Sequence, residues 1–262
     1  MNNNKKRIFW LILTSLFTAL TFSLSYVNIP FPLGGIVHLG NFAAILAALI
    51  GGPLCGGISG SLGMGLFDLS AGFPPSTIIR SFILKFIVCY VAGVIFKSIK
   101  KNERYSNIFY IIGSFLFLII GTLTLLPVIT NNGNFTFTLG SQTKTMVINI
   151  LIPIMSYIFT AILIVMIFIS NKMSNIAKAA SISTTFAILI NITFEIILRT
   201  LFVGIESGSF EAAFATAITK IPSSIITGII TIIAIAVIFP PLYLAIKNTD
   251  IIKEIENDNL FL

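Results

Sequence analysis

The chain has 262 residues, of which 56% are hydrophobic and only 10% are charged, and its net charge is +7 at pH 7. Its mean hydropathy of +1.03 excludes an ordinary soluble domain and predicts an all-α protein that crosses the cell membrane several times. The sequence contains no P-loop, zinc-protease or nucleophile-elbow motif, and it has one histidine. We therefore expect no catalytic residues, no cofactor, no metal and no nucleic-acid partner. A membrane enzyme is a weaker alternative.

The first long apolar run, residues 8–27, follows a basic N-terminus. A helix of this length is about 30 Å long, which is enough for one crossing, and the run is too long for a signal peptide. Within it Ser15, Ala19 and Ser23 recur at every fourth position. They form a stripe of small side chains against which another helix can pack, either inside the chain or from a partner.

Glycine and proline dominate the next part of the chain. Two short apolar segments meet at residues 51–53, Gly-Gly-Pro, where a helix break is expected because proline lacks a backbone donor. Glycines then recur at Gly52, Gly56 and Gly60. This spacing predicts a helix with a groove of bare backbone along one face, where a neighbouring helix can approach closely. The segment ends near Asp68.

Further apolar runs predict helices at about 78–96, 108–129, 146–169, 179–203 and 212–245. If the chain crosses about eight times from a cytoplasmic N-terminus, 11 of its 16 Lys and Arg residues lie on the cytoplasmic side. Cytoplasmic loops of membrane proteins carry an excess of basic residues. The distribution therefore predicts that both the N-terminus and the C-terminus are cytoplasmic.

The order and spacing of these residues resemble the substrate-binding S component of energy-coupling factor (ECF) vitamin transporters, near the riboflavin-type group. The positions that carry the resemblance are Gly40-Asn41, Gly51-Gly52-Pro53, Gly56, Gly57, Gly60, Gly63, Asp68, Gly72, Lys85 and Ala92-Gly93. The resemblance implies a core of six helices. We therefore expect core helices 1–4 in residues 1–105, an inserted transmembrane hairpin of two helices in 106–175, core helices 5–6 in 176–246 and a cytoplasmic tail in 247–262.

The resemblance also implies how the chain works with partners. Ser15 and Ala19 match a small-residue motif that docks on a transmembrane coupling subunit, and Ser23 extends the same stripe. The family subunit acts with that coupling protein and two ABC-type ATPases, which hydrolyse the ATP. The loop at 28–39 corresponds to a lid over the substrate. An ordinary tight turn at this loop is the alternative.

Five charged residues of the predicted helices share one property. Arg80, Lys85, Glu195, Arg199 and Lys220 all fall within about 5 to 15 Å of the external side, counted along the helices. A charge facing lipid costs roughly 2.5–3.5 kcal/mol on insertion scales. The pattern therefore predicts a polar cavity that opens outward.

Three of the polar residues share a helix face, because Asn191, Glu195 and Arg199 are spaced by four. Lys85 and Glu195 have similar expected depths, so we expect a buried ion pair between them. The pair either neutralises itself or also hydrogen-bonds a ligand. In the outer half, four cations face only Asp68 and Glu195. This excess of two positive charges predicts a vitamin or precursor that bears carboxylate, phosphate or several carbonyl oxygens.

Aromatic and hydroxyl side chains complete the predicted site. Phe31 and Phe73 offer surfaces for a flat ring, and Pro222 is followed by Ser223 and Ser224 where the family often has an amide pair. The predicted substrate-binding residues are Phe31, His38, Asn41, Asp68, Phe73, Arg80, Lys85, Asn191, Glu195, Arg199 and Ser224.

These observations together predict the specificity (S) component of an ECF-type ABC importer in the plasma membrane, which binds a vitamin from outside. The alternative is a self-contained secondary transporter driven by an ion gradient, which would show internal repeats and charged groups near the membrane midplane. We find no convincing internal repeat. A scaffold without transport activity is a third possibility, although it gives no reason for the buried charges.

Overall fold

The protein is described from a computed structural model, in residues 3–32, 35–101, 106–139, 142–147, 150–170 and 172–249. Its helices are α1 (Asn3–Ser25), α2 (Gly40–Gly51), α3 (Pro53–Ser70), α4 (Pro75–Lys101), α5 (Ser106–Thr130), α6 (Leu151–Ser170), α7 (Asn175–Ser207), α8 (Phe210–Thr219) and α9 (Ile221–Ile246). Two antiparallel hairpins connect helices: β1 (Asn28–Pro30) with β2 (Ile36–His38), and β3 (Asn134–Leu139) with β4 (Gln142–Val147).

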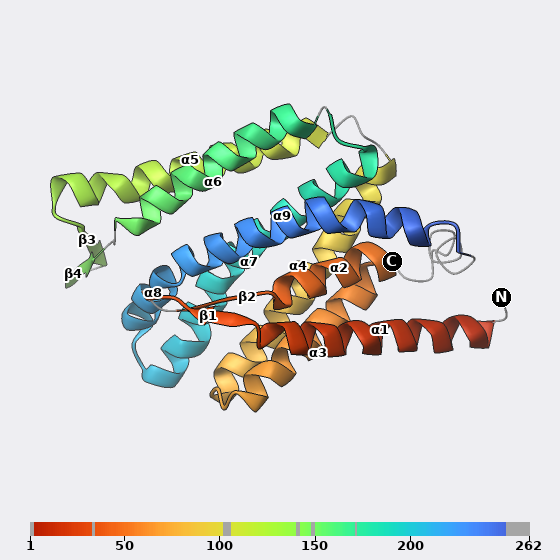
Figure 1. Ribbon diagram of the computed structural model, residues 1–262. Helices are drawn as coiled ribbons and strands as arrows, with labels where there is room; N and C mark the ends of the chain where they lie inside the picture. The colour runs from red at the N-terminus through yellow and green to blue at the C-terminus, as the bar shows by residue number, and fades with distance from the viewer. Residues whose placement is uncertain are drawn as a thin grey trace.

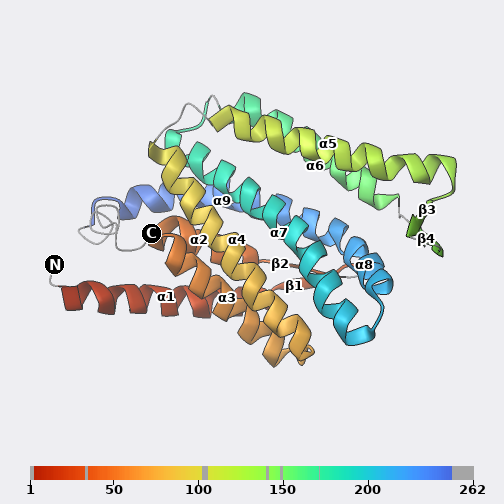
Figure 2. The same cartoon turned by 180° about the vertical axis from the view of Figure 1, so that it is seen from behind.

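The helices form one bundle with a paired layer along one side (Figures 1 and 2). Helices α1, α2, α3 and α4 pack on one another, and α7 joins them through α4. Helices α5 and α6 pack together and reach the bundle through α7 and α9. The start of α1 and the end of α9 lie at one end of the bundle, and the β1–β2 hairpin and α8 lie at the other (Figure 1).

Six segments are long and apolar enough to cross a membrane: Lys5–Ser25, Pro75–Lys101, Asn107–Thr130, Ile152–Ile169, Asn175–Ser207 and Phe210–Ile246. They confirm the prediction of an all-helical membrane protein with several spans. Helix α2 has 12 residues, so it is about 18 Å long and shorter than the ~30 Å hydrocarbon layer. The count of eight crossings and the cytoplasmic termini remain predictions.

The predicted helix break in the glycine-rich part is confirmed. Helix α2 ends at Gly51, and α3 begins with Pro53 at its first turn. Between them Gly52 has φ +88°, a conformation that glycine adopts without the steric cost of a Cβ atom. The chain can therefore reverse within one residue, which brings α2 and α3 side by side.

Two predicted helix boundaries differ from the structure. The apolar run at 146–169 begins as strand β4, and α6 starts only at Leu151, because the alternating Thr-x-Thr-x-Val pattern at 143–147 favours pairing with β3. The run at 212–245 is divided into α8 and α9, which meet at Lys220. Pro222 stands in the first turn of α9, where its missing N–H costs no hydrogen bond.

Gly56 permits the closest approach between α2 and α3. A Cβ atom added at Gly56 would lie 2.5 Å from the Ala48 Cα and 2.7 Å from the Ala48 backbone nitrogen. Backbone atoms cannot move aside as the end of a side chain can. The two helices therefore need a glycine at this position.

We expect Gly56→Ala to lower the free energy of unfolding by about 2 kcal/mol, because overpacking outweighs the better helix propensity of alanine. Thermal unfolding in detergent measures the loss. The matched control is Gly113→Ala in α5, where the nearest atom to the new methyl group is the flexible end of Leu163 at 3.2 Å. Equal stability of the two variants would contradict the proposed close approach.

Candidate functional site

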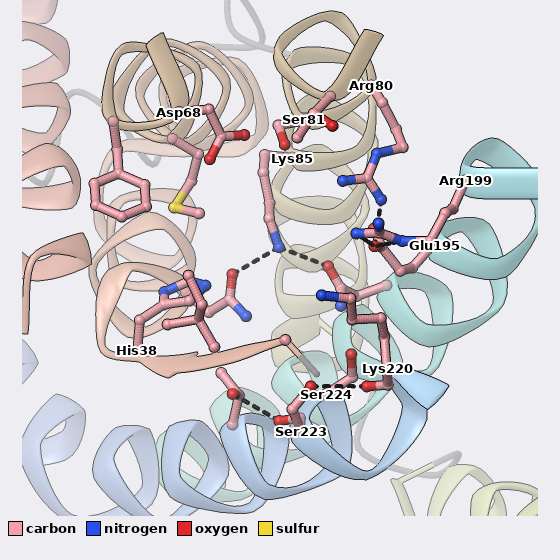
Figure 3. Close-up of a pocket in the computed structure, with 18 of the residues that line it drawn as sticks. His38, Asp68, Arg80, Ser81, Lys85, Glu195, Arg199, Lys220, Ser223 and Ser224 are labelled. Carbon is pink, nitrogen blue, oxygen red and sulfur yellow. Dashed lines mark hydrogen bonds and ion pairs between the residues drawn. The ribbon is translucent and has the colours of Figure 1, made fainter. Parts of the chain in front are cut away.

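A polar cavity lies at the end of the bundle that carries the β1–β2 hairpin. Its volume is about 190 Å³, which is below the roughly 300–1,000 Å³ of typical ligand pockets. Side chains converge on it from α2, α3, α4, α7 and α9 and from strand β2 (Figure 3). The lining residues are Gly35, Ile36, His38, Asn41, Met64, Phe67, Asp68, Phe73, Thr77, Arg80, Ser81, Lys85, Asn191, Glu195, Arg199, Lys220, Ser223, Ser224 and Thr227.

The cavity brings together ten of the eleven predicted substrate-binding residues. Phe31 is the exception: it lies in the β1–β2 connection, where its backbone N–H donates to the Gly35 carbonyl at 3.1 Å. The prediction missed Thr77 and Ser81 in the lining. Both precede Lys85 at spacings of four on α4, so helical periodicity from Lys85 would have found them.

Lys85 occupies the middle of the cavity (Figure 3). Its side chain is buried, and its ammonium donates hydrogen bonds to Asn41 Oδ1 at 2.8 Å and Asn191 Oδ1 at 2.7 Å. Because an ammonium group only donates, it fixes both amides with their oxygens toward Lys85. The NH₂ groups of both amides are then left to donate to other partners.

Glu195 joins two arginines. Its Oε1 atom accepts a hydrogen bond from Arg80 Nη1, and it also accepts from Arg199 Nε at 2.9 Å and Arg199 Nη2 at 2.7 Å. Arg80 on α4 and Glu195 on α7 therefore form an ion pair between helices, whereas Arg199 follows Glu195 by one turn of α7. All three side chains are largely buried.

The predicted ion pair between Lys85 and Glu195 is wrong. Arg80 contacts Glu195, and Lys85, which follows Arg80 on α4, contacts Asn191, which precedes Glu195 on α7. The two helices therefore run antiparallel, in a register that places Asn191 beside Lys85. The depths of Lys85 and Glu195, each estimated along its own helix, were therefore wrong relative to each other by about one turn, or ~5 Å. Lys85 is therefore solvated by amide oxygens, and Glu195 is neutralised by arginines.

Asp68 and His38 lie on the side of the cavity away from Arg199 (Figure 3). Asp68 is 6% exposed, and its Oδ2 atom has no hydrogen-bond partner among the residues that the structure describes. His38 Nδ1 accepts a hydrogen bond from the Gly40 backbone N–H at 3.1 Å. The neutral imidazole therefore carries its proton on Nε2 and can donate from there.

His38 is expected to stay neutral from pH 8 to pH 5, because burial and the nearby Lys85 cation lower its pKa to about 3. His38 is the only histidine of the chain, so NMR of an untagged, histidine-labelled sample shows this side chain alone. We expect constant imidazole shifts in this range. Between pH 6.5 and 3 the unfolded chain binds a proton that the folded chain does not. Acid should therefore destabilise the fold by up to about 1.4 kcal/mol per pH unit. A titration midpoint near 6.5 would contradict the assignment.

The stripe predicted to bind a coupling subunit lies on the surface of α1. Ser15, Ala19 and Ser23 are all exposed, so they do not pack inside the described part of the chain. Ser15 and Ala19 also line an apolar groove between α1 and α3. The stripe is thus available to another helix, and its partner remains a prediction.

Within the described ranges, no three His, Cys, Asp or Glu side chains gather in a way that suits a metal ion. The cavity instead offers hydrogen-bond donors, hydroxyl groups and charge. Such groups can recognise a polar ligand.

Comparison with protein families matches residues 5–172 to the family model described as ECF-type riboflavin transporter, S component. The match covers well over half of the chain and extends from α1 through α6. The cavity residues of α7 and α9 follow the matched range. Searches of curated proteins and of solved structures each found no match.

Proposed function

This chain belongs to the family of S components of ECF-type riboflavin transporters, and on that premise we propose that it is the substrate-specificity subunit of a vitamin importer. As a member of the family it is a multi-pass membrane subunit of a transporter and not an enzyme. Its proposed substrate is a vitamin or vitamin precursor, which binds in the polar cavity.

The observation that carries this proposal is the convergence of charged and amide side chains in an otherwise apolar chain. Side chains from three helices meet around one cavity: Arg80 and Lys85 from α4, Asn41 from α2 and Glu195 from α7. Ionisable groups inside membrane proteins are costly and usually mark substrate or ion sites. Ligand binding accounts for this cost, whereas a scaffold role does not.

The cavity is proposed to open to the outside. The start of α1 and the end of α9 lie at the end of the bundle opposite the cavity (Figure 1), and the basic residues favour cytoplasmic termini. We propose about eight crossings for this orientation, with the short α2 and the glycine-rich α3 as two of them. A vitamin as large as riboflavin needs more room than about 190 Å³. The β1–β2 hairpin, which lines the cavity through Gly35, Ile36 and His38, is proposed to shift on binding.

Energy for release into the cell is proposed to come from partners. The chain has no P-loop, so ATP hydrolysis belongs to two ABC-type ATPases that a transmembrane coupling subunit connects to this chain. The exposed stripe at Ser15, Ala19 and Ser23 is the proposed contact with the coupling subunit. The pair α5 and α6, within residues 106–175, is proposed to be an inserted hairpin beside the six-helix core.

Native mass spectrometry of the purified chain, with thermal shifts for a panel of vitamins that includes riboflavin, tests the proposal. We expect one small molecule to co-purify and the same molecule to raise the unfolding temperature. Absence of both effects would contradict the proposal. Uptake into vesicles by the chain alone, driven by an ion gradient, would instead support a secondary transporter.

A further inference from the structure

Three cations surround one carboxylate at one side of the cavity. Glu195 accepts from Arg80 and Arg199 through a single oxygen, and Lys220 lines the same side (Figure 3). These four groups leave an excess of two positive charges. Uncompensated charge in a site shielded from water is unfavourable unless a ligand or another charge balances it.

Glu195 does not accept hydrogen bonds from all the N–H groups of these three cations. The buried Nε atom of Arg80 has no hydrogen-bond partner within the described part of the chain. Lys220 is partly buried at the junction of α8 and α9, and no described side chain forms a hydrogen bond or ion pair with its ammonium. The N–H groups that Arg80 and Lys220 have left can therefore bind an acceptor that enters the cavity.

The opposite side of the cavity has different chemistry. Asp68 is 6% exposed, and its Oδ2 atom lacks a donor among the described residues. A buried acceptor without a partner costs about 1–3 kcal/mol. A ligand that places an N–H group against Asp68 removes this cost, and Lys85 lies between the two sides (Figure 3).

We propose that the substrate is an anion: its carboxylate or phosphate group binds the remaining N–H groups of Lys220 and Arg80, and an N–H group at its other end binds Asp68. This inference rests on the proposed function and makes its substrate class more specific. Riboflavin, the vitamin in the family description, is uncharged at neutral pH. The excess of positive charge in the cavity favours an anionic ligand, and an uncharged vitamin would not require it.

Pairs of related ligands, one neutral and one anionic, test the inference. The probes are riboflavin with riboflavin 5′-phosphate, biotin amide with biotin, and panthenol with pantothenate, titrated calorimetrically against the full chain in neutral detergent. In the pair that binds, we expect the anion to bind about 10- to 100-fold more tightly than the neutral member. Added salt should reduce the difference.

Lys220→Met is expected to reduce that preference about tenfold or more, and Lys220→Arg is expected to retain it. Lys247→Met is the matched control, because Lys247 is an exposed lysine at the opposite end of α9. This variant should prefer the anionic ligand as strongly as the parent chain does. If Lys220→Met fails to fold, the ratio of the affinities of the parent chain for the anionic and the neutral member of each pair decides whether the substrate is an anion.

The outcomes separate this inference from the proposed function. A neutral member that binds as tightly as its anion overturns the anion inference and leaves the vitamin-binding function intact. A preference that survives Lys220→Met overturns the assigned position of the anion. Binding by no pair, with no co-purified small molecule, overturns both the proposed function and the inference.

Discussion

Lys85→Met is expected to weaken substrate binding by about 100-fold. The ammonium of Lys85 holds the oxygens of Asn41 and Asn191 at 2.8 and 2.7 Å, which orients their NH₂ groups. Methionine keeps the length of the side chain but removes the charge and both donors, and hydrogen bonds to charged groups contribute about 1.5–3 kcal/mol each. Both amides then lose their fixed orientation, in addition to any direct contact between Lys85 and the ligand.

Lys101→Met is the matched control, because Lys101 is exposed at the other end of α4. Its affinity should stay within a factor of two of the parent chain. Calorimetric titration with the co-purified ligand measures both variants, and thermal unfolding shows whether each is folded. Unchanged affinity in a folded Lys85→Met variant would remove Lys85 from the site.

The fold was predictable where local chemistry determines it. Gly-Gly-Pro at 51–53 breaks the helix for reasons present in those three residues. The strand at 142–147 was not predicted, because its apolar end continues into the next helix without a break in hydropathy. Short apolar runs do not by themselves distinguish strand from helix, since pairing with a neighbouring segment decides between them.

The membership of the cavity was predictable, but its pairing was not. Charges within apolar helices must point to a polar interior, which identified the charged lining residues Arg80, Lys85, Glu195, Arg199 and Lys220. Which cation meets Glu195 depends on the relative shift of α4 and α7, and a shift of one turn exchanges Lys85 for Arg80 as its partner. That shift is determined by packing along the whole interface. The charged residues alone contain no information on it.

Glu195→Gln is expected to lower the free energy of unfolding by about 3–5 kcal/mol, because it leaves buried arginines without a counter-charge. The Arg80 side chain is 5% exposed and that of Arg199 is 17% exposed. Arg199→Met should cost less, since Glu195 keeps Arg80 as its partner and the lost cation is nearer to solvent. Thermal or denaturant unfolding in detergent compares the variants.

Glu206→Gln provides the matched control on the same helix. Glu206 is exposed and accepts a hydrogen bond from Ser76, which the amide oxygen of glutamine can still accept, so the change should stay within about 0.5 kcal/mol. The double variant Glu195→Gln with Arg80→Met should be more stable than the sum of the single losses predicts, by about 1–3 kcal/mol. Additive losses would show that the pair is not coupled. If Glu195→Gln were as stable as Glu206→Gln, water would have to solvate the arginines, and the cavity would be more open than the structure shows.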